Sequence, residues 1–312
     1  MGVQVPGGRR VRWRDVVLAT GDGPTPEVRG RLWLPTGGPA PPVLLAAGVT
    51  PQGVADPRVM RLASALARAQ RVVFVPELDL PRDRVGEVDV ERLIRAMLAL
   101  DGHPGARGGL VALGFSFGGS FSLVAAADER VADRLRFVAA FGAYGHLAGL
   151  VQAATTGVTT VGEHVFRWAG HERTSGLLRR RLEQTLASGH GMFTDEDREL
   201  LRALLDNRDP ARVEALLARL PAPLPALMER LSPVTVAHRV RAPVALLHAV
   251  DDPIIPYAEL HRLVRAFPDA RVHEVRLFTH VDFRPAPARI VEAVRDLVAT
   301  WRFAAALLAA GR

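Results

Sequence analysis

The sequence predicts an α/β protein with a mostly parallel, doubly wound sheet, helices on both faces of that sheet, and an inserted all-helical segment. Two observations support this fold class. Short apolar runs bounded by glycine and proline alternate with helical patterns. The alternation stops near residue 145, only helical patterns follow to about residue 231, and then it resumes. We therefore expect an α/β core at residues 1–144 and 232–312 and a helical cap at residues 145–231.

The elements of the expected core follow one another in a simple order. Residues 11–18 and 27–34 are separated by a turn sequence and predict an antiparallel opening pair of strands. The later apolar runs predict strands buried on both faces, at residues 43–47, 71–75, 110–115, 135–141, 244–249 and 271–277. Helical spacing between or after these runs predicts helices at residues 59–70, 90–100, 118–131, 257–266 and 286–301.

Two helix starts can be read inside the expected cap. Thr194 is followed three residues later by Asp197, which is a capping-box arrangement. Asp209 followed by Pro210 places a capping carboxylate before a proline at the first helical position. The proline-rich stretch at residues 221–226 is expected to break the helical pattern. No strand is expected between residues 145 and 231.

Composition excludes several functional classes. All 40 basic residues are arginine, and they are interspersed with 33 acidic residues, so no contiguous basic face for nucleic acid is expected. Cysteine is absent, which excludes disulfides, a thiolate nucleophile and cysteine-bound metal. No apolar run has the length of a membrane span, and the N-terminal residues MGVQVPGGRRVRWRD contain no apolar core of signal-peptide length, so we expect a cytoplasmic protein. The histidine spacing predicts no metal site, and neither G-x-G-x-x-G nor a P-loop follows a strand, so no cofactor is expected.

A strand-to-helix turn carries the most informative motif. Residues 110–126 read LVALGFSFGGSFSLVAA, an apolar strand, then G-x-S-x-G, then a helix. In this context the motif is a nucleophile elbow, which lifts the hydroxyl of Ser116 above the sheet. Gly114 and Gly118 flank the serine because side chains at these positions would collide in the tight turn. An incidental serine in a glycine-rich turn is the alternative interpretation.

A nucleophilic serine needs a base and an acid that orients the base. His280 follows the last expected strand in RLFTHVDF, and it is preferred because it alone among the ten histidines combines such a loop with a position after the acid. The acid lies in LLHAVDDPIIP, just after another buried strand. The carboxyl ends of such strands meet at one edge of an open α/β sheet, where sites are usual.

These segments, in the order Ser, Asp, His, resemble those of α/β-hydrolases, specifically serine hydrolases of the esterase and lipase type with a helical cap. The acid of that family commonly lies in a pattern like H-G-x-x-D-x-x-V-P, and residues 248–256 read HAVDDPIIP. The resemblance therefore implies that Asp252 is the acid, and Asp251 is expected to face solvent or an arginine. It covers most of the chain outside the expected cap.

An oxyanion hole requires two backbone N–H groups. Phe117, the residue after the nucleophile, is expected to supply one. The second should come from the loop after the strand at residues 43–47, where many relatives have His-Gly and this chain has Ala47-Gly48. The resemblance implies Val49 as this donor, with Thr50 as the alternative.

The motifs together predict a cofactor-free hydrolase of carboxylic esters that forms an acyl-enzyme intermediate. The substrate is expected to be a small-molecule ester with an apolar acyl group. Phe166, Trp168 and Met192 are candidate lining residues in the cap, and the alternative is that these apolar residues form the core of the cap. Two alternatives stay open. The same triad serves a thioester or amide hydrolase or an acyltransferase, and a hydrolase-like binding protein would keep the triad without turnover.

Overall fold

The computed structural model describes residues 11–20, 27–80, 86–188, 194–280, 282–283 and 290–311. Its main sheet has eight strands in the order β1-β2-β4-β3-β5-β6-β9-β10. The strands are β1 (Arg12–Ala19), β2 (Glu27–Leu34), β3 (Pro42–Ala46), β4 (Val72–Pro76), β5 (Leu110–Phe115), β6 (Leu135–Phe141), β9 (Val244–Ala249) and β10 (Arg271–Val275). β1 and β2 pair antiparallel, β2 also pairs antiparallel with β4, and all later neighbours pair in parallel. The predicted mostly parallel sheet with an antiparallel opening pair is confirmed.

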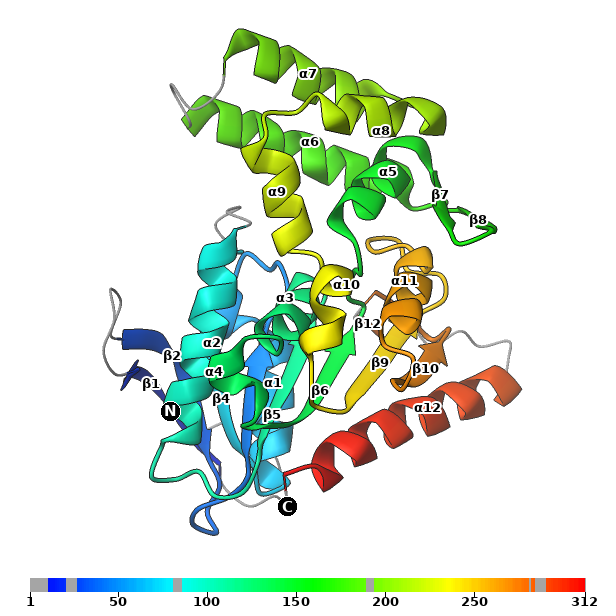
Figure 1. The fold of residues 1–312 in the computed structure, drawn as a ribbon. Coiled ribbons are helices and arrows are strands. Elements are labelled where there is room, and N and C mark those ends of the chain that lie inside the picture. Colours follow the sequence, from blue (N-terminus) through cyan, green and yellow to red (C-terminus); the bar gives the residue numbers. More distant parts are fainter. Residues whose placement is uncertain are drawn as a thin grey trace.

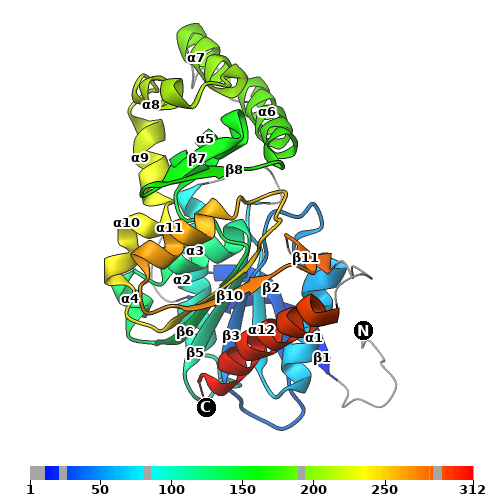
Figure 2. The same cartoon turned by 90° about the vertical axis from the view of Figure 1, so that its right-hand side faces the viewer.

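Helices cover both faces of this sheet (Figures 1 and 2). One face carries α2 (Glu87–Asp101), α3 (Phe117–Ala125) and α11 (Ala258–Ala266), and the other carries α1 (Pro57–Arg68) and α12 (Ile290–Ala309). Successive residues of each central strand point to opposite faces. In β3, Leu44 packs toward α2 and Leu45 packs toward α1 and α12. This alternation explains why the central strands read as continuous apolar runs.

The connections between the main elements are short. They contain the 3-10 helices η1 (Gly53–Ala55) and η3 (Ala237–Arg239) and the short helices α4 (Glu129–Ala132) and α10 (Pro233–Val236). The helix predicted over residues 118–131 is divided, because α3 ends at Ala125 and the Asp128 side chain accepts from the backbone of Arg130 to begin α4. The predicted start of the last helix, at residues 286–289, lies outside the described residues.

Residues 145–231, which we call the cap segment, lie above the sheet in Figure 1. The segment contains α5 (Leu147–Thr156), α6 (His171–Ser188), α7 (Asp195–Asp206), α8 (Pro210–Ala218) and α9 (Pro223–Arg230). Both predicted caps are present, since Thr194 and Asp197 form a capping box and the Asp209 side chain accepts from Ala211 N. The helical pattern is interrupted between Ala218 and Pro223, at the start of the stretch expected to break it, and α9 then begins at Pro223, where the missing N–H of proline leaves no helical bond unmade.

The prediction that this segment is all-helical is wrong in one respect. β7 (Val158–Val161) and β8 (His164–Arg167) form an antiparallel hairpin between α5 and α6. Each strand has only four residues, which is too short for a period-2 pattern to stand out from its helical surroundings. Gly157, at a φ of 71°, ends α5 and turns the chain into this hairpin.

Candidate active site

Ser116 occupies the turn between β5 and α3 in a strained conformation. Its φ and ψ are 53° and −129°, and its backbone N donates to the carbonyl oxygen of Phe141 at 2.8 Å. A non-glycine residue with positive φ persists only where the surrounding structure enforces it, and such residues cluster at functional sites. The side chain is buried, and its hydroxyl has no hydrogen-bond partner within the described ranges.

Three glycines make this turn possible. A Cβ on Gly114 would overlap the carbonyl oxygen of Gly118, and a Cβ on Gly118 would overlap the carbonyl oxygen of Ala47. A Cβ on Gly48 would lie 2.9 Å from Cβ of Ser116. Glycine at position 48 therefore lets the loop after β3 approach the serine closely, and any larger residue there would push the loop away.

Asp252 and His280 are joined by a short contact. Nδ1 of His280 lies 2.7 Å from Oδ2 of Asp252, while Oδ1 of Asp252 accepts from the backbone N of Ile254 at 2.8 Å and of Ile255 at 2.9 Å. Both carboxylate oxygens are thus engaged, and the side chain of Asp252 is fully buried. An Nδ1–H donated to the carboxylate leaves Nε2 of the ring free to accept a proton.

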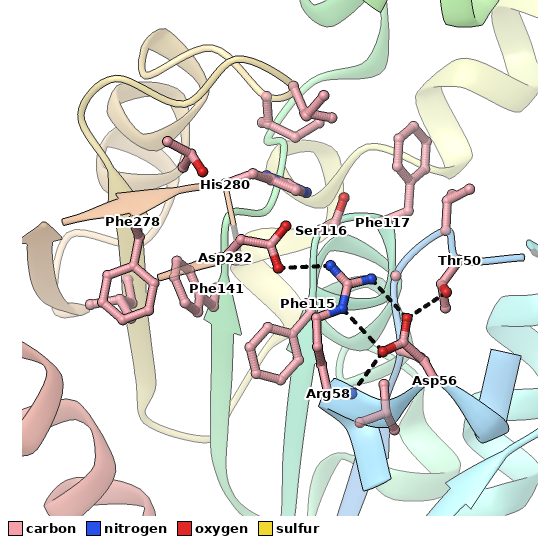
Figure 3. A pocket seen from close by; sticks show the side chains of 18 of the residues that line it. Thr50, Asp56, Arg58, Phe115, Ser116, Phe117, Phe141, Phe278, His280 and Asp282 are labelled. Carbon is pink, nitrogen blue, oxygen red and sulfur yellow. Dashed lines mark hydrogen bonds and ion pairs between the residues drawn. The ribbon is translucent and has the colours of Figure 1, made fainter. Parts of the chain in front are cut away.

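His280 and Ser116 border the same cavity, and Figure 3 draws the ring of His280 on the side of the Ser116 hydroxyl. His280 follows β11 (Phe278–Thr279), which pairs with β12 (Asp282–Phe283) in a minimal hairpin, and its φ of 61° fits a tight turn. Gly142 makes room for the ring, because a Cβ there would lie 3.2 Å from both Cε1 and Nδ1 of His280. Sequence reasoning missed this glycine, since its importance depends on a contact between residues far apart in the chain.

Both expected oxyanion donors border the same cavity as Ser116. Phe117 is the first residue of α3, where a backbone N–H has no partner within its helix. Val49 follows Gly48 in the loop after β3. Neither N–H donates to another group among the residues that the structure describes. The role of these two N–H groups as oxyanion donors stays a prediction.

Thr50, the alternative donor, belongs to a polar network that the sequence did not reveal (Figure 3). Its hydroxyl donates to Asp56 at 2.6 Å. Arg58 donates to Asp56 through Nη2 at 2.7 Å, and its Nη1 donates to Asp282 at 2.9 Å. The hydrogen bonds from Arg58 lower the pKa of Asp56 well below its usual range. Arg58 thereby connects the start of α1 to the hairpin that carries His280.

Two neighbours of Asp252 have distinct environments. Asp251 directs a largely exposed carboxylate toward Arg276, with a separation of 3.9 Å. His248 is buried, its Nε2 lies 3.1 Å from the carbonyl oxygen of Ile255, and burial lowers its pKa. A neutral His248 can donate to that carbonyl and support the loop that carries Asp252.

A cavity of about 1080 Å³ opens at Ser116 and His280. The cap segment contributes Leu150 of α5 to its lining, together with Arg173, Thr174, Leu177, Leu178 and Arg180 of α6. Of the candidate lining residues, Phe166 and Trp168 do not border this cavity. Met192 lies outside the described residues.

The described residues show neither a cluster of metal ligands nor a membrane-spanning helix. In the described parts of the chain, no three His, Asp or Glu side chains gather to hold a metal ion. Likewise, no described helix combines the length and the apolar character that are needed to cross a membrane.

Comparison with known proteins finds similarity only among solved structures. No protein-family model matches the sequence, and no curated protein is significantly similar to it. A puromycin-hydrolyzing peptidase of Mycobacterium tuberculosis superposes with a TM-score of 0.56 and 19% identity, covering 94% of this chain and 38% of that one. A puromycin hydrolase gives 0.56 and 16%, covering 96% of this chain and 39% of that one.

Brefeldin A esterase, described as a bacterial homologue of human hormone sensitive lipase, gives a TM-score of 0.55 and 18% identity. The match covers 99% of this chain and 79% of the esterase. In contrast, the chain spans about two fifths of the length of the two puromycin-hydrolysing proteins. At these identities the comparison concerns the arrangement of strands and helices, and the chemistry must be argued from this chain's own residues.

Proposed function

We propose that this chain, which has the α/β-hydrolase fold, is a serine hydrolase that cleaves carboxylic esters through Ser116, His280 and Asp252. The observation that carries the proposal is the 2.7 Å contact between His280 and a fully buried Asp252, with the same histidine ring beside a strained serine. The resemblance inferred from the sequence is confirmed for the fold.

The first chemical step follows from these positions. Nε2 of His280 removes the proton of the Ser116 hydroxyl as its oxygen attacks the ester carbonyl. Asp252 keeps the imidazole in the required tautomer and stabilises the imidazolium that forms. The backbone N–H groups of Val49 and Phe117 donate to the oxyanion of the tetrahedral intermediate.

The intermediate then collapses as His280 gives its proton to the leaving alcohol, which leaves the acyl group bound to Ser116. Water enters, loses a proton to the same histidine and attacks the acyl carbon. The carboxylic acid leaves and the serine is restored. The chain's own side chains and backbone amides carry every step of this scheme.

The cap segment is proposed to cover this site, with residues 1–144 and 232–312 forming the catalytic core. All three proposed catalytic residues lie in the core, whereas Leu177 and Leu178 of α6 border the cavity from the cap segment. The two parts meet at a hydrogen-bonded junction, where Tyr144 donates from its hydroxyl to the carbonyl oxygen of Leu231 at 2.8 Å. The cap segment would then shape the substrate side of the cavity without taking part in the chemistry.

Amide hydrolysis by the same three residues is the second candidate function. The structural neighbours with TM-scores of 0.55 and 0.56 include both an esterase and a peptidase, so the shared fold does not favour one acyl group over the other. Comparing a p-nitrophenyl ester with the p-nitroanilide of the same acid on purified protein separates the two. Added alcohol in the ester assay tests acyl transfer.

We expect the protein to release p-nitrophenol from p-nitrophenyl esters. It should hydrolyse each ester faster than the p-nitroanilide of the same acid. Ser116→Ala is expected to lose several orders of magnitude in turnover while remaining folded. Retention of more than a tenth of the activity by that variant would contradict the role of Ser116.

A further inference from the structure

The cavity at Ser116 extends far beyond the reacting groups, into an apolar trough between α1 and α12. We call this part the α1–α12 trough. It is bordered by Leu45 and Leu113 of the sheet, Leu62 and Leu66 of α1, and Phe303 and Leu307 of α12. In Figure 3 the strand that ends at Ser116 runs down from the serine between the blue helix of Arg58, which is α1, and the red helix α12. All six of these side chains are hydrocarbon, and Thr300 of α12 also borders the cavity, with a buried hydroxyl that has no hydrogen-bond partner among the described residues.

The two walls of the trough are fixed at both ends of α12. Near its start, the buried carboxylate of Asp296 accepts from the backbone N of Arg276 and of Leu277. Near its end, the buried guanidinium of Arg71 donates to the carbonyl oxygens of Leu308 and Ala310. These bonds oppose a collapse of α12 onto α1, so the trough is a built feature of the fold.

A space of this size is not a packing defect. Protein interiors contain few voids larger than a water molecule, and the whole cavity of about 1080 Å³ exceeds the usual ~300–1,000 Å³ of small-ligand sites. The hydroxyl of Thr300 would give a water molecule one polar partner there, fewer than the two to four that stabilise buried water. The lining therefore favours an apolar guest.

The trough is continuous with the site of reaction. Phe115, the residue before Ser116, and Phe141 on the adjacent strand border the same cavity as Leu66 and Leu307. The apolar lining residues of α1 extend from Val59 to Leu66, which is about 10 Å along the helix axis. A guest attached at Ser116 would thus extend along the helices, and a chain of many methylenes fits this better than an acetyl group.

We propose that the α1–α12 trough binds a long, unbranched hydrocarbon chain of the substrate. This inference rests on the proposed function, in which Ser116 attacks the carbonyl of that substrate. The chain belongs either to the acyl group or to the alcohol of the ester. Each methylene that moves from water into the trough is expected to raise kcat/KM by about fourfold until the trough is full.

The kinetic test compares two series of esters below their critical micelle concentrations. The first series is p-nitrophenyl acetate, butyrate, octanoate and laurate, which lengthens the acyl group. The second is the acetates of ethanol, butanol, octanol and dodecanol, which lengthens the alcohol. We expect kcat/KM to rise with length in one series, and that series identifies the part of the substrate in the trough.

Two variants narrow the trough from opposite walls. Ala304 borders the cavity from α12 and Leu62 borders it from α1, so Ala304→Phe and Leu62→Phe each place a ring in the path of the chain. Either variant is expected to lower the ratio of kcat/KM for the longest ester over the acetate by at least tenfold. Ala309→Phe is the matched control, because Ala309 is an exposed alanine of the same helix that does not border the cavity. It should leave the ratio unchanged.

A binding measurement separates this inference from the proposed function. cis-Parinaric acid, a fluorescent fatty acid, is titrated into Ser116→Ala protein, with and without Ala304→Phe or Leu62→Phe. Saturable binding that Ala304→Phe or Leu62→Phe weakens at least tenfold supports binding of a hydrocarbon chain in the trough, even if no ester is hydrolysed. Length-independent ester hydrolysis in both series, with no difference between the trough variants and Ala309→Phe in either assay, would overturn the trough and leave the proposed function standing.

Discussion

The indole Nε1 of Trp168 donates to the backbone carbonyl oxygen of Asp252 at 2.8 Å. Trp168 lies just after β8 in the cap segment, so this hydrogen bond ties that segment to the loop of the proposed catalytic acid. The indole does not border the cavity. Its expected role is therefore to position the acid loop. The effect of replacing Trp168 on kcat/KM should then be independent of the length of the substrate.

Trp168→Phe removes this N–H while keeping an aromatic ring. Loss of one such bond should reduce kcat/KM by about three- to tenfold, by the same factor on p-nitrophenyl acetate and on p-nitrophenyl octanoate. Phe166→Leu on the same hairpin is the control, since Phe166 packs against His261 and a phenylalanine side chain cannot donate a hydrogen bond to the acid loop. A change in the ratio between the two esters would show that Trp168 acts on substrate selection.

Conservative substitutions of the two adjacent aspartates are expected to differ greatly in their effect on kcat. Asp252→Asn keeps the shape of the site but removes the charge that stabilises the imidazolium, and a loss of about 10⁴ in kcat is expected. Asp251 is three-quarters exposed and lies 3.9 Å from Arg276, so Asp251→Asn should change kcat by less than about tenfold. Both variants are measured on one p-nitrophenyl ester, and the reverse ranking would assign the acid to Asp251.

Asp56 is expected to support the fold of the loop beside the oxyanion site. Its buried carboxylate caps α1 through Arg58 N and accepts from Thr50 and the Arg58 side chain. Asp56→Asn should lower the free energy of unfolding by about 2–3 kcal/mol at pH 7. Asp15→Asn is the control, because Asp15 pairs with Arg31 in an exposed position where such pairs contribute less than ~1 kcal/mol.

The stability difference between wild type and Asp56→Asn is also expected to depend on pH. Because Arg58 lowers the pKa of Asp56 in the folded protein, this carboxylate stabilises the fold above its unfolded pKa of about 3.9. That contribution is lost as pH falls toward the folded pKa. The stability difference between wild type and Asp56→Asn should therefore stay constant from pH 8 to pH 5 in urea unfolding and narrow only below about pH 4. A stability difference that already becomes smaller at pH 6 would contradict the lowered pKa of Asp56.

Local sequence patterns were sufficient to predict most strands and helices of the core. The central strands are buried on both faces, so their continuous apolar runs stand out, and the tight turn at Ser116 requires glycines at fixed offsets. The β7–β8 hairpin could not be predicted in this way, because strands of four residues depend on pairing with each other more than on their own pattern.

The surroundings of the site depended on contacts between distant residues. Arg58 and Asp282 are 224 positions apart, and Gly142, just after β6, leaves the space beside it to the ring of His280. The candidate lining residues were sought in the cap, whereas the trough lies between α1 and α12, whose separation is set by anchors such as Arg71. No pattern within either helix encodes that separation.

The central claim is that Ser116 is an activated nucleophile, and covalent labelling tests it most directly. The purified chain is incubated with a fluorophosphonate, which forms a stable adduct with an activated serine, and intact mass and peptide mapping follow. The account predicts one adduct per chain, located on Ser116, absent from Ser116→Ala and formed much more slowly in Asp252→Asn. A folded wild-type protein that remains unlabelled, or that carries the adduct on another residue, would contradict it.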